Sequence, residues 1–133
     1  MKKPLWIGSV LGLIIVITLF SLFGKSLIGG PKLEIPHDRW DFGTAKTGSV
    51  LKHDFILKNT GKTELTINAY PNCPRCMSLE LEKSNIPPNG TTKLHVAISS
   101  KGEGPYEVYV MLESNDPLHK VKKLTMKGTF VKD

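Results

Sequence analysis

Residues 51–61 read Leu-Lys-His-Asp-Phe-Ile-Leu-Lys-Asn-Thr-Gly, and this stretch decides the fold class. Leu51, His53, Phe55 and Leu57 occupy alternate positions, so an extended chain places all four on one face. The Asn-Thr-Gly that follows supplies residue types that favour a tight turn. The stretch therefore predicts a β-strand that buries one face and ends in a turn.

The same alternation recurs through the chain after Pro31, where no helical period is evident. The expected strands are residues 32–35, 51–58, 64–69, 79–82, 93–98, 106–113 and 124–130. Turn-forming residues separate them at positions 59–62, 87–90, 102–105 and 115–117. Seven short strands in about 100 residues predict an all-β fold, an immunoglobulin-like seven-stranded antiparallel β-sandwich, with a small barrel as the alternative.

A long apolar run precedes the predicted sandwich. Residues 5–23, LWIGSVLGLIIVITLFSLF, are 19 consecutive uncharged residues. A helix of this length spans about 28 Å, close to the roughly 30 Å hydrocarbon core of a bilayer. Lys2 and Lys3 stand before the run, so the positive-inside rule places the N-terminus in the cytoplasm. We therefore expect one N-terminal transmembrane α-helix.

This helix divides the chain into three parts. Residues 1–24 are the expected transmembrane anchor in the cell (inner) membrane, residues 25–31 a linker, and residues 32–133 a periplasmic or extracellular domain. The alternative is a cleaved signal peptide, whose best cleavage site is Gly24-Lys25-Ser26. That site fits the small-x-small pattern poorly, and the apolar run is longer than is usual in signal peptides. The exported domain follows from either interpretation.

Charge argues against a nucleic-acid partner. Beyond residue 30 the chain holds 15 basic and 12 acidic residues, a net charge of +3. A nucleic-acid surface needs a concentrated basic patch. We expect partners among proteins and lipid instead, with residues 5–23 in contact with the bilayer.

Cys73 and Cys76 are the only cysteines, in the segment Asn-Cys-Pro-Arg-Cys-Met. They are open to four interpretations. The pair forms a local disulfide, or stays inert, in an oxidising compartment; it exchanges disulfides, since Cys-Pro-x-Cys is similar to the thioredoxin motif; or it binds Cu(I) with Met77 as a third soft ligand. Haem attachment requires His directly after the second cysteine, and Met77 stands there.

No catalytic motif is present in the sequence. There is no Gly-x-Ser-x-Gly, no His-Glu-x-x-His and no glycine-rich phosphate loop, and the four histidines have no metal-ligand spacing. We predict that His53 faces the core and that His95 faces solvent. The chain is therefore expected not to be an enzyme and, copper apart, to carry no cofactor.

Several short motifs occur in a characteristic order. They are Asp41-Phe42-Gly43, His53-x-Phe55-x-Leu57-Lys58-Asn59-Thr60-Gly61, the cysteine pair, Ile86-Pro87-Pro88-x-Gly90 and Ser114-Asn115-Asp116-Pro117. Over residues 31–131 this set resembles the bacterial "domain of unknown function 1573" family, which is similar to the ASPM–SPD-2–Hydin domains. The resemblance implies an immunoglobulin-like sandwich in an exported or surface location. It implies no catalytic residues, and the extra residue between the cysteines departs from the Ser-Cys-Gly-Cys-Thr-like segment of that family.

These features together favour a membrane-anchored, non-enzymatic interaction module. We expect an accessory or scaffold subunit that docks on other membrane or periplasmic proteins in a multi-subunit complex. The alternative is a thiol-redox or copper-binding protein that acts through Cys73 and Cys76.

Overall fold

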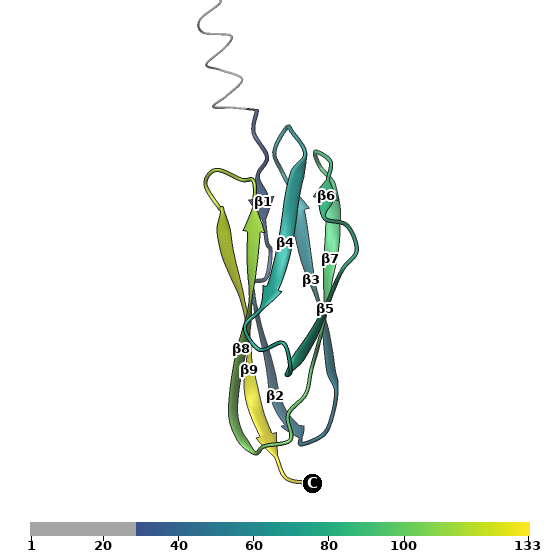
Figure 1. Ribbon diagram of the computed structural model, residues 1–133, viewed down its shortest axis with the longest axis vertical. Helices are drawn as coiled ribbons and strands as arrows, with labels where there is room; N and C mark the ends of the chain where they lie inside the picture. Colours follow the sequence, from purple (N-terminus) through teal and green to yellow (C-terminus); the bar gives the residue numbers. More distant parts are fainter. Residues whose placement is uncertain (1–28) are drawn as a thin grey trace, which may run out of the picture.

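The computed structural model describes residues 29–133, which form a β-sandwich (Figure 1). Its nine strands are β1 (Leu33–Glu34), β2 (Arg39–Lys46), β3 (Leu51–Asn59), β4 (Leu65–Pro71), β5 (Met77–Leu81), β6 (Asn85–Ile86), β7 (Thr91–Ile98), β8 (Gly104–Ser114) and β9 (Val121–Val131). The transmembrane helix expected at residues 5–23 lies outside the described residues. Between residues 29 and 133, no helix has the length and apolar character needed to span a bilayer.

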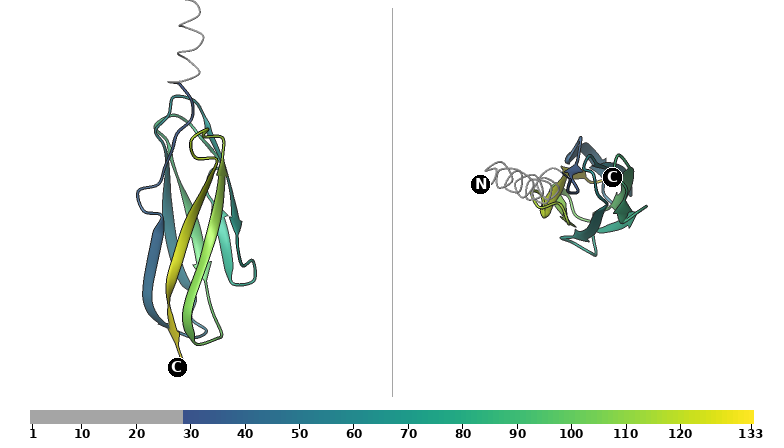
Figure 2. Two further views of the ribbon diagram at one scale, coloured as in Figure 1. Left: turned by 90° about the vertical axis from the view of Figure 1, so that its left-hand side faces the viewer. Right: turned by 90° about the horizontal axis from the view of Figure 1, so that it is seen from above.

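The strands form two sheets that extend along the long axis of the domain (Figure 2). The four-stranded sheet has the order β1-β3-β7-β5, and the five-stranded sheet has the order β2-β9-β8-β4-β6. The C-terminus lies at the end opposite β1 (Figure 1). The predicted all-β sandwich is confirmed. The predicted strand count and uniform antiparallel pairing are wrong, because two further strands exist and β2 pairs with β9 in parallel.

The chain reaches the parallel pairing by changing sheets. β1 pairs with β3 in the four-stranded sheet, and the segment around Pro36 then leads to β2 at the edge of the five-stranded sheet. β2 contains a bulge between Asp41 and Gly43, where Gly43 has a φ of 69° and its N–H donates to Asp41 Oδ1 (2.9 Å). A bulge interrupts the two-residue period. This interruption hides β2 from a search for alternation.

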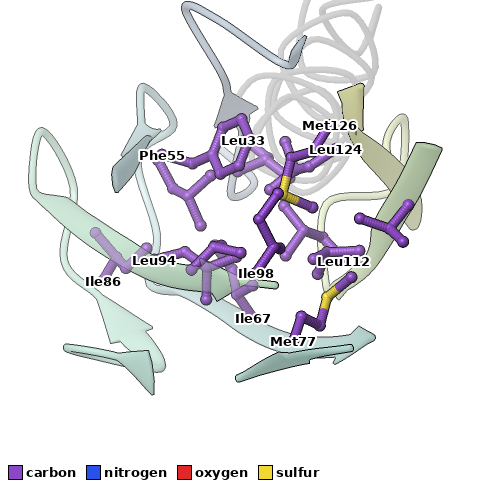
Figure 3. Packing of buried hydrophobic residues seen from close by; sticks show 14 of the residues in the cluster. Leu33, Phe55, Ile67, Met77, Ile86, Leu94, Ile98, Leu112, Leu124 and Met126 are labelled. Atoms are coloured by element: carbon purple, nitrogen blue, oxygen red, sulfur yellow. The ribbon is translucent and has the colours of Figure 1, made fainter. Parts of the chain in front are cut away.

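The core lies between the sheets and consists of the residues that alternate inward (Figure 3). The largest fully buried side chains are Phe55, Phe130, Leu57, Leu65, Ile67, Ile86, Leu94, Ile98, Leu112, Leu124, Met126 and Val96. Burial of each such side chain contributes about 1.5–3 kcal/mol relative to exposure. Nearly all of them come from the strands that alternation predicts, so burial of these faces is the main stabilising term.

Two buried polar side chains tie β1 to the rest of the domain. Asn59 is fully buried. Its Nδ2 donates to the carbonyls of Thr63 (2.8 Å) and Ile86 (2.9 Å), and its Oδ1 accepts the N–H groups of Gly61 (2.9 Å) and Lys32 (3.3 Å). One side chain thereby satisfies backbone groups of three separate segments.

Asp116, which is 1% exposed, holds the other side of the same end. Its Oδ2 accepts the Leu33 N–H (2.8 Å), and its Oδ1 accepts the Leu118 N–H (2.9 Å). Burial acts to raise the pKa of this carboxyl, but the two backbone donors and His119 outweigh burial and hold the pKa below its ordinary value. Asp116 therefore stays ionised while it caps β1.

Gly61 completes this end of the domain. A Cβ at this position would overlap the Gly30 carbonyl oxygen and the Lys32 nitrogen. The Lys62 N–H also donates to the Gly30 carbonyl (3.1 Å). The chain is thus fixed to the domain from Gly30 onward.

We expect Asn59→Ala to lower the free energy of unfolding by about 2–3 kcal/mol, since it leaves buried backbone groups of Ile86 and Gly61 without partners. Urea unfolding followed by circular dichroism measures the loss. Asn68→Ala on the exposed face of β4 is the matched control and should change stability by less than about 0.5 kcal/mol. Equal effects of the two substitutions would contradict the role assigned to Asn59.

Candidate functional site

The predicted cysteine site lies where the chain crosses from the five-stranded to the four-stranded sheet, between β4 and β5. Cys73 and Cys76 form a disulfide, with their Cα atoms 5.3 Å apart. The Cys76 N–H also donates to the Cys73 carbonyl (3.0 Å), which closes a tight turn. Pro74 occupies the second position of this turn, where its fixed φ is favourable.

Hydrogen bonds of the backbone and of the Asn72 side chain hold this turn to both sheets. The Asn72 N–H donates to the Tyr109 carbonyl (3.0 Å), and the Tyr109 N–H donates to Asn72 Oδ1 (2.9 Å). On the other side, the Ser99 N–H donates to the Cys76 carbonyl (3.2 Å). The crossing is therefore positioned by the ladders as well as by the disulfide.

The third residue of the predicted copper site, Met77, is 6% exposed and packs in the core (Figure 3). Its thioether therefore belongs to the sandwich interior, and the two cysteine sulfurs are bonded to each other. Thiolate is the form of cysteine that ligates metal and attacks disulfides, so both activities require prior reduction of the pair. Across residues 29–133, no three His, Cys, Asp or Glu side chains are grouped so as to hold a metal ion. The copper and thiol-exchange interpretations stay predictions.

A charged cluster lies on the outer face of the four-stranded sheet. His95 on β7 stands opposite Asp54 on β3. Its Nδ1 lies 2.6 Å from Asp54 Oδ1, and its Nε2 lies 2.9 Å from Glu82 Oε1, just beyond β5. The imidazole is 36% exposed. It joins three neighbouring strands at the surface.

The two carboxylates determine the charge of this imidazole. Hydrogen bonds to Asp54 and then Glu82 raise the pKa of His95, and the bond from His95 lowers the pKa of Asp54. Both shifts favour the ion pair. With both ring nitrogens engaged, the cluster serves as a cross-strand link between β3, β7 and β5.

His53, which alternation predicts on the inner face of β3, lies on that face and is half-buried. Its ring stacks on Trp40 of β2 with centroids 4.6 Å apart and meets Phe55 edge-on at 4.7 Å. Burial lowers the pKa of His53, against a smaller opposing effect of Asp54. The Trp40–His53 stack therefore connects β2 of the five-stranded sheet with β3 of the four-stranded sheet.

Sequence reasoning misses the Asp54–His95–Glu82 cluster. Alternation does place Asp54 and His95 on outward faces, which is the one signal available. The contact, however, depends on the register between β3 and β7 and on Glu82 lying beyond its strand. Neither is encoded in a local pattern.

The architecture defines an immunoglobulin-like sandwich. Residues 31–129 match the family described as HYDIN/CFA65/VesB-like, Ig-like domain, and the chain belongs to this family. No curated protein matches the sequence significantly.

Solved structures show the same fold at low sequence identity. A protein of unknown function from Porphyromonas gingivalis W83 is 18% identical with a TM-score of 0.68, over 77% of this chain and 48% of that one. The ASH / PapD-like domain of human CEP192 is 15% identical with a TM-score of 0.60, over 77% of this chain and 87% of that one. The secreted serine protease VesC from Vibrio cholerae is 11% identical with a TM-score of 0.57, over 86% of this chain and 26% of that one. The chain thus spans about half of the Porphyromonas protein, and these similarities concern the fold alone.

The His95 cluster predicts a pH-dependent stability. Since the folded-state pKa of His95 is raised, its stabilisation is complete below the ordinary histidine pKa of about 6.5 and is lost as the pH rises through the raised value. We expect the excess stability of the wild type over His95→Gln to shrink as the pH rises above about 6.5, as measured by urea unfolding at each pH.

His53→Phe is the control with the opposite sign. The folded-state pKa of His53 is lowered, so the wild type loses stability relative to this variant as the pH falls below about 6.5. A difference between wild type and His95→Gln that stays constant with pH would contradict the ion pair.

The double variant Cys73→Ser/Cys76→Ser should stay folded and lose about 2 kcal/mol, the chain-entropy value for so short a loop. The reason is that the hydrogen bonds to Tyr109 and Ser99 remain. Urea unfolding of the double variant and of the reduced wild type should give the same loss. A loss above about 4 kcal/mol would mean that the disulfide itself holds the crossing.

Proposed function

We propose that the chain is a membrane-anchored, non-enzymatic interaction module, an accessory or scaffold subunit that docks on a membrane or periplasmic protein complex. The observation that carries this proposal is the hydrogen-bonded start of the domain. Gly30, Lys32 and Leu33 are fixed by Lys62, Asn59 and Asp116. Only residues 24–29 separate this fixed start from the apolar run that ends at residue 23. A rigid domain close to the bilayer suits a docking role.

The proposed topology has a cytoplasmic N-terminus, residues 5–23 in the inner membrane and the sandwich in the periplasm or outside the cell. Lys2 and Lys3 before the apolar run support this orientation. The Cys73–Cys76 disulfide also supports it, since such bonds persist in oxidising compartments.

Within its family, we place the chain in the bacterial "domain of unknown function 1573" group. The ordered motifs support this assignment, and two of them have clear structural roles here. Asn59 of Asn-Thr-Gly and Asp116 of Ser-Asn-Asp-Pro are the side chains that fix β1. Both residues have structural roles, so these motifs give no support for a catalytic activity.

The proposal is tested by gentle detergent extraction of the full chain from its native membrane, followed by native electrophoresis. We expect the chain to migrate in a complex well above the size of the 14.7 kDa chain in its micelle. A chain lacking residues 1–24 but exported by a cleavable signal peptide is the control, and it should leave the membrane fraction. Migration of the intact chain as a free monomer in every mild detergent would contradict the docking role.

A further inference from the structure

The two sheets end in four edge strands, and these strands differ in how readily they can pair with another strand. β1 and β6 contain two residues each, and β2 is interrupted by the bulge at Asp41 and Gly43. β5 is regular: Met77–Leu81 pair with β7 without a register shift. In the described part of the chain, β7 is the one strand that β5 pairs with. Proteins usually guard edge strands with bulges or by keeping them very short, and β5 lacks the protection that the other three edge strands have.

The hydrogen-bond register shows which backbone groups β5 offers. The Ser99 N–H donates to the Cys76 carbonyl, and the Glu82 N–H donates to the Lys93 carbonyl. In an antiparallel pair, the backbone groups of alternate residues point to opposite sides. Even-numbered residues of this strand therefore bond to β7. Met77, Leu79 and Leu81 direct their N–H and C=O groups to the open side.

The side chains along β5 determine which residue types a paired strand needs. Leu79 and Leu81 face the sandwich interior but are only half-buried. Glu80 is exposed on the outer face, and Glu82 follows it on that face. Arg75 and Lys83 lie beyond the two ends of β5, and Glu80 and Glu82 form a short acidic stripe at its C-terminal end.

We propose that the open edge of β5 docks an extended segment of a partner protein, which joins the four-stranded sheet as a fifth strand. This segment alternates apolar residues, which cover Leu79 and Leu81, with Lys or Arg residues, which face Glu80 and Glu82. Backbone hydrogen bonds supply affinity in this mode of recognition, and alternate side chains supply specificity. The inference rests on the proposed docking function and names its surface and the chemistry of its partner.

A second copy of this chain does not fit this edge in the proposed topology. Two β5 strands that pair antiparallel are related by a twofold axis perpendicular to the strands. That axis sends the β1 ends of the two copies in opposite directions. Copies anchored in one membrane have their β1 ends on the same side, so the partner segment belongs to a different protein.

The probe is a synthetic capped peptide, Val-Lys-Val-Lys-Val-Lys, titrated into the full-length chain in detergent micelles. We expect binding that slows amide hydrogen exchange at Met77, Leu79 and Leu81. The affinity for Val-Glu-Val-Glu-Val-Glu should be lower by a factor of about ten or more. An inability of the basic peptide to bind, or protection of other strands instead, would overturn the proposal.

Leu79→Pro removes one outward N–H of β5 and spares the bonds to β7. It should therefore lower the affinity for the basic peptide by about tenfold. Ile56→Pro is the matched control. The Thr60 N–H donates to the Lys32 carbonyl, which shows that even-numbered residues of β3, Ile56 included, direct their backbone to the opposite edge of the sheet. This variant should bind like the wild type.

Glu80→Lys keeps the backbone edge intact and reverses one charge of the stripe, so the test does not depend on how well Leu79→Pro folds. This substitution should lower the affinity for the basic peptide and raise the affinity for the acidic one. Equal binding of both peptides to wild type and Glu80→Lys would overturn the proposal. A native complex that survives Leu79→Pro and Glu80→Lys would also overturn the β5 site while leaving the docking function standing. If the wild-type chain itself forms no complex, the docking function is contradicted instead.

Discussion

Every buried backbone group at the β1 end of the sandwich needs a partner, and side chains supply the partners that no ladder can. β1 has two residues, too few to hold itself in the sheet by pairing with β3 alone. Asn59, at the end of β3, and Asp116, in the loop after β8, add the missing bonds. With β1 fixed, the chain can leave one sheet and cross to the other as β2. The parallel β2–β9 pair and the Trp40–His53 stack both follow from that crossing.

The second crossing, at Cys73 and Cys76, obeys the same constraint by different means. The chain leaves β4 with its last bond to Tyr109 and enters β5 with its first bond to Ser99. A turn of four residues spans the gap, and its disulfide closes on a conformation that the ladders already impose. The disulfide thus lies between the last bond of β4 and the first bond of β5. The same crossing delivers β5 to the edge of its sheet, where, among residues 29–133, it pairs with β7 alone.

Alternation in the sequence was sufficient for seven of the strands because burial of one face is a local pattern. It was insufficient for β2, whose bulge shifts Phe42 and Ala45 out of step, and for β6, whose two residues carry no period. The sequence also contained Asn59 and Asp116 as turn residues, but not their contacts with β1, 27 and 83 positions away. The same limit applies to Asp54, His95 and Glu82. Long-range register, unlike periodicity, is decided by the whole fold.

The rigid start of the domain and the open edge of β5 have a joint consequence. Association costs less when the binding surface is ordered before the partner arrives. Hydrogen bonds fix the chain to the sandwich from Gly30 onward, and the Asp54–His95–Glu82 link fixes β5 to β7 and β3. In the proposed topology, the few residues between Gly30 and the apolar run limit how far the edge of β5 can stand from the bilayer. A partner strand in the same membrane pairs with it only from a matching height, so geometry selects the partner alongside the apolar and basic pattern of its side chains.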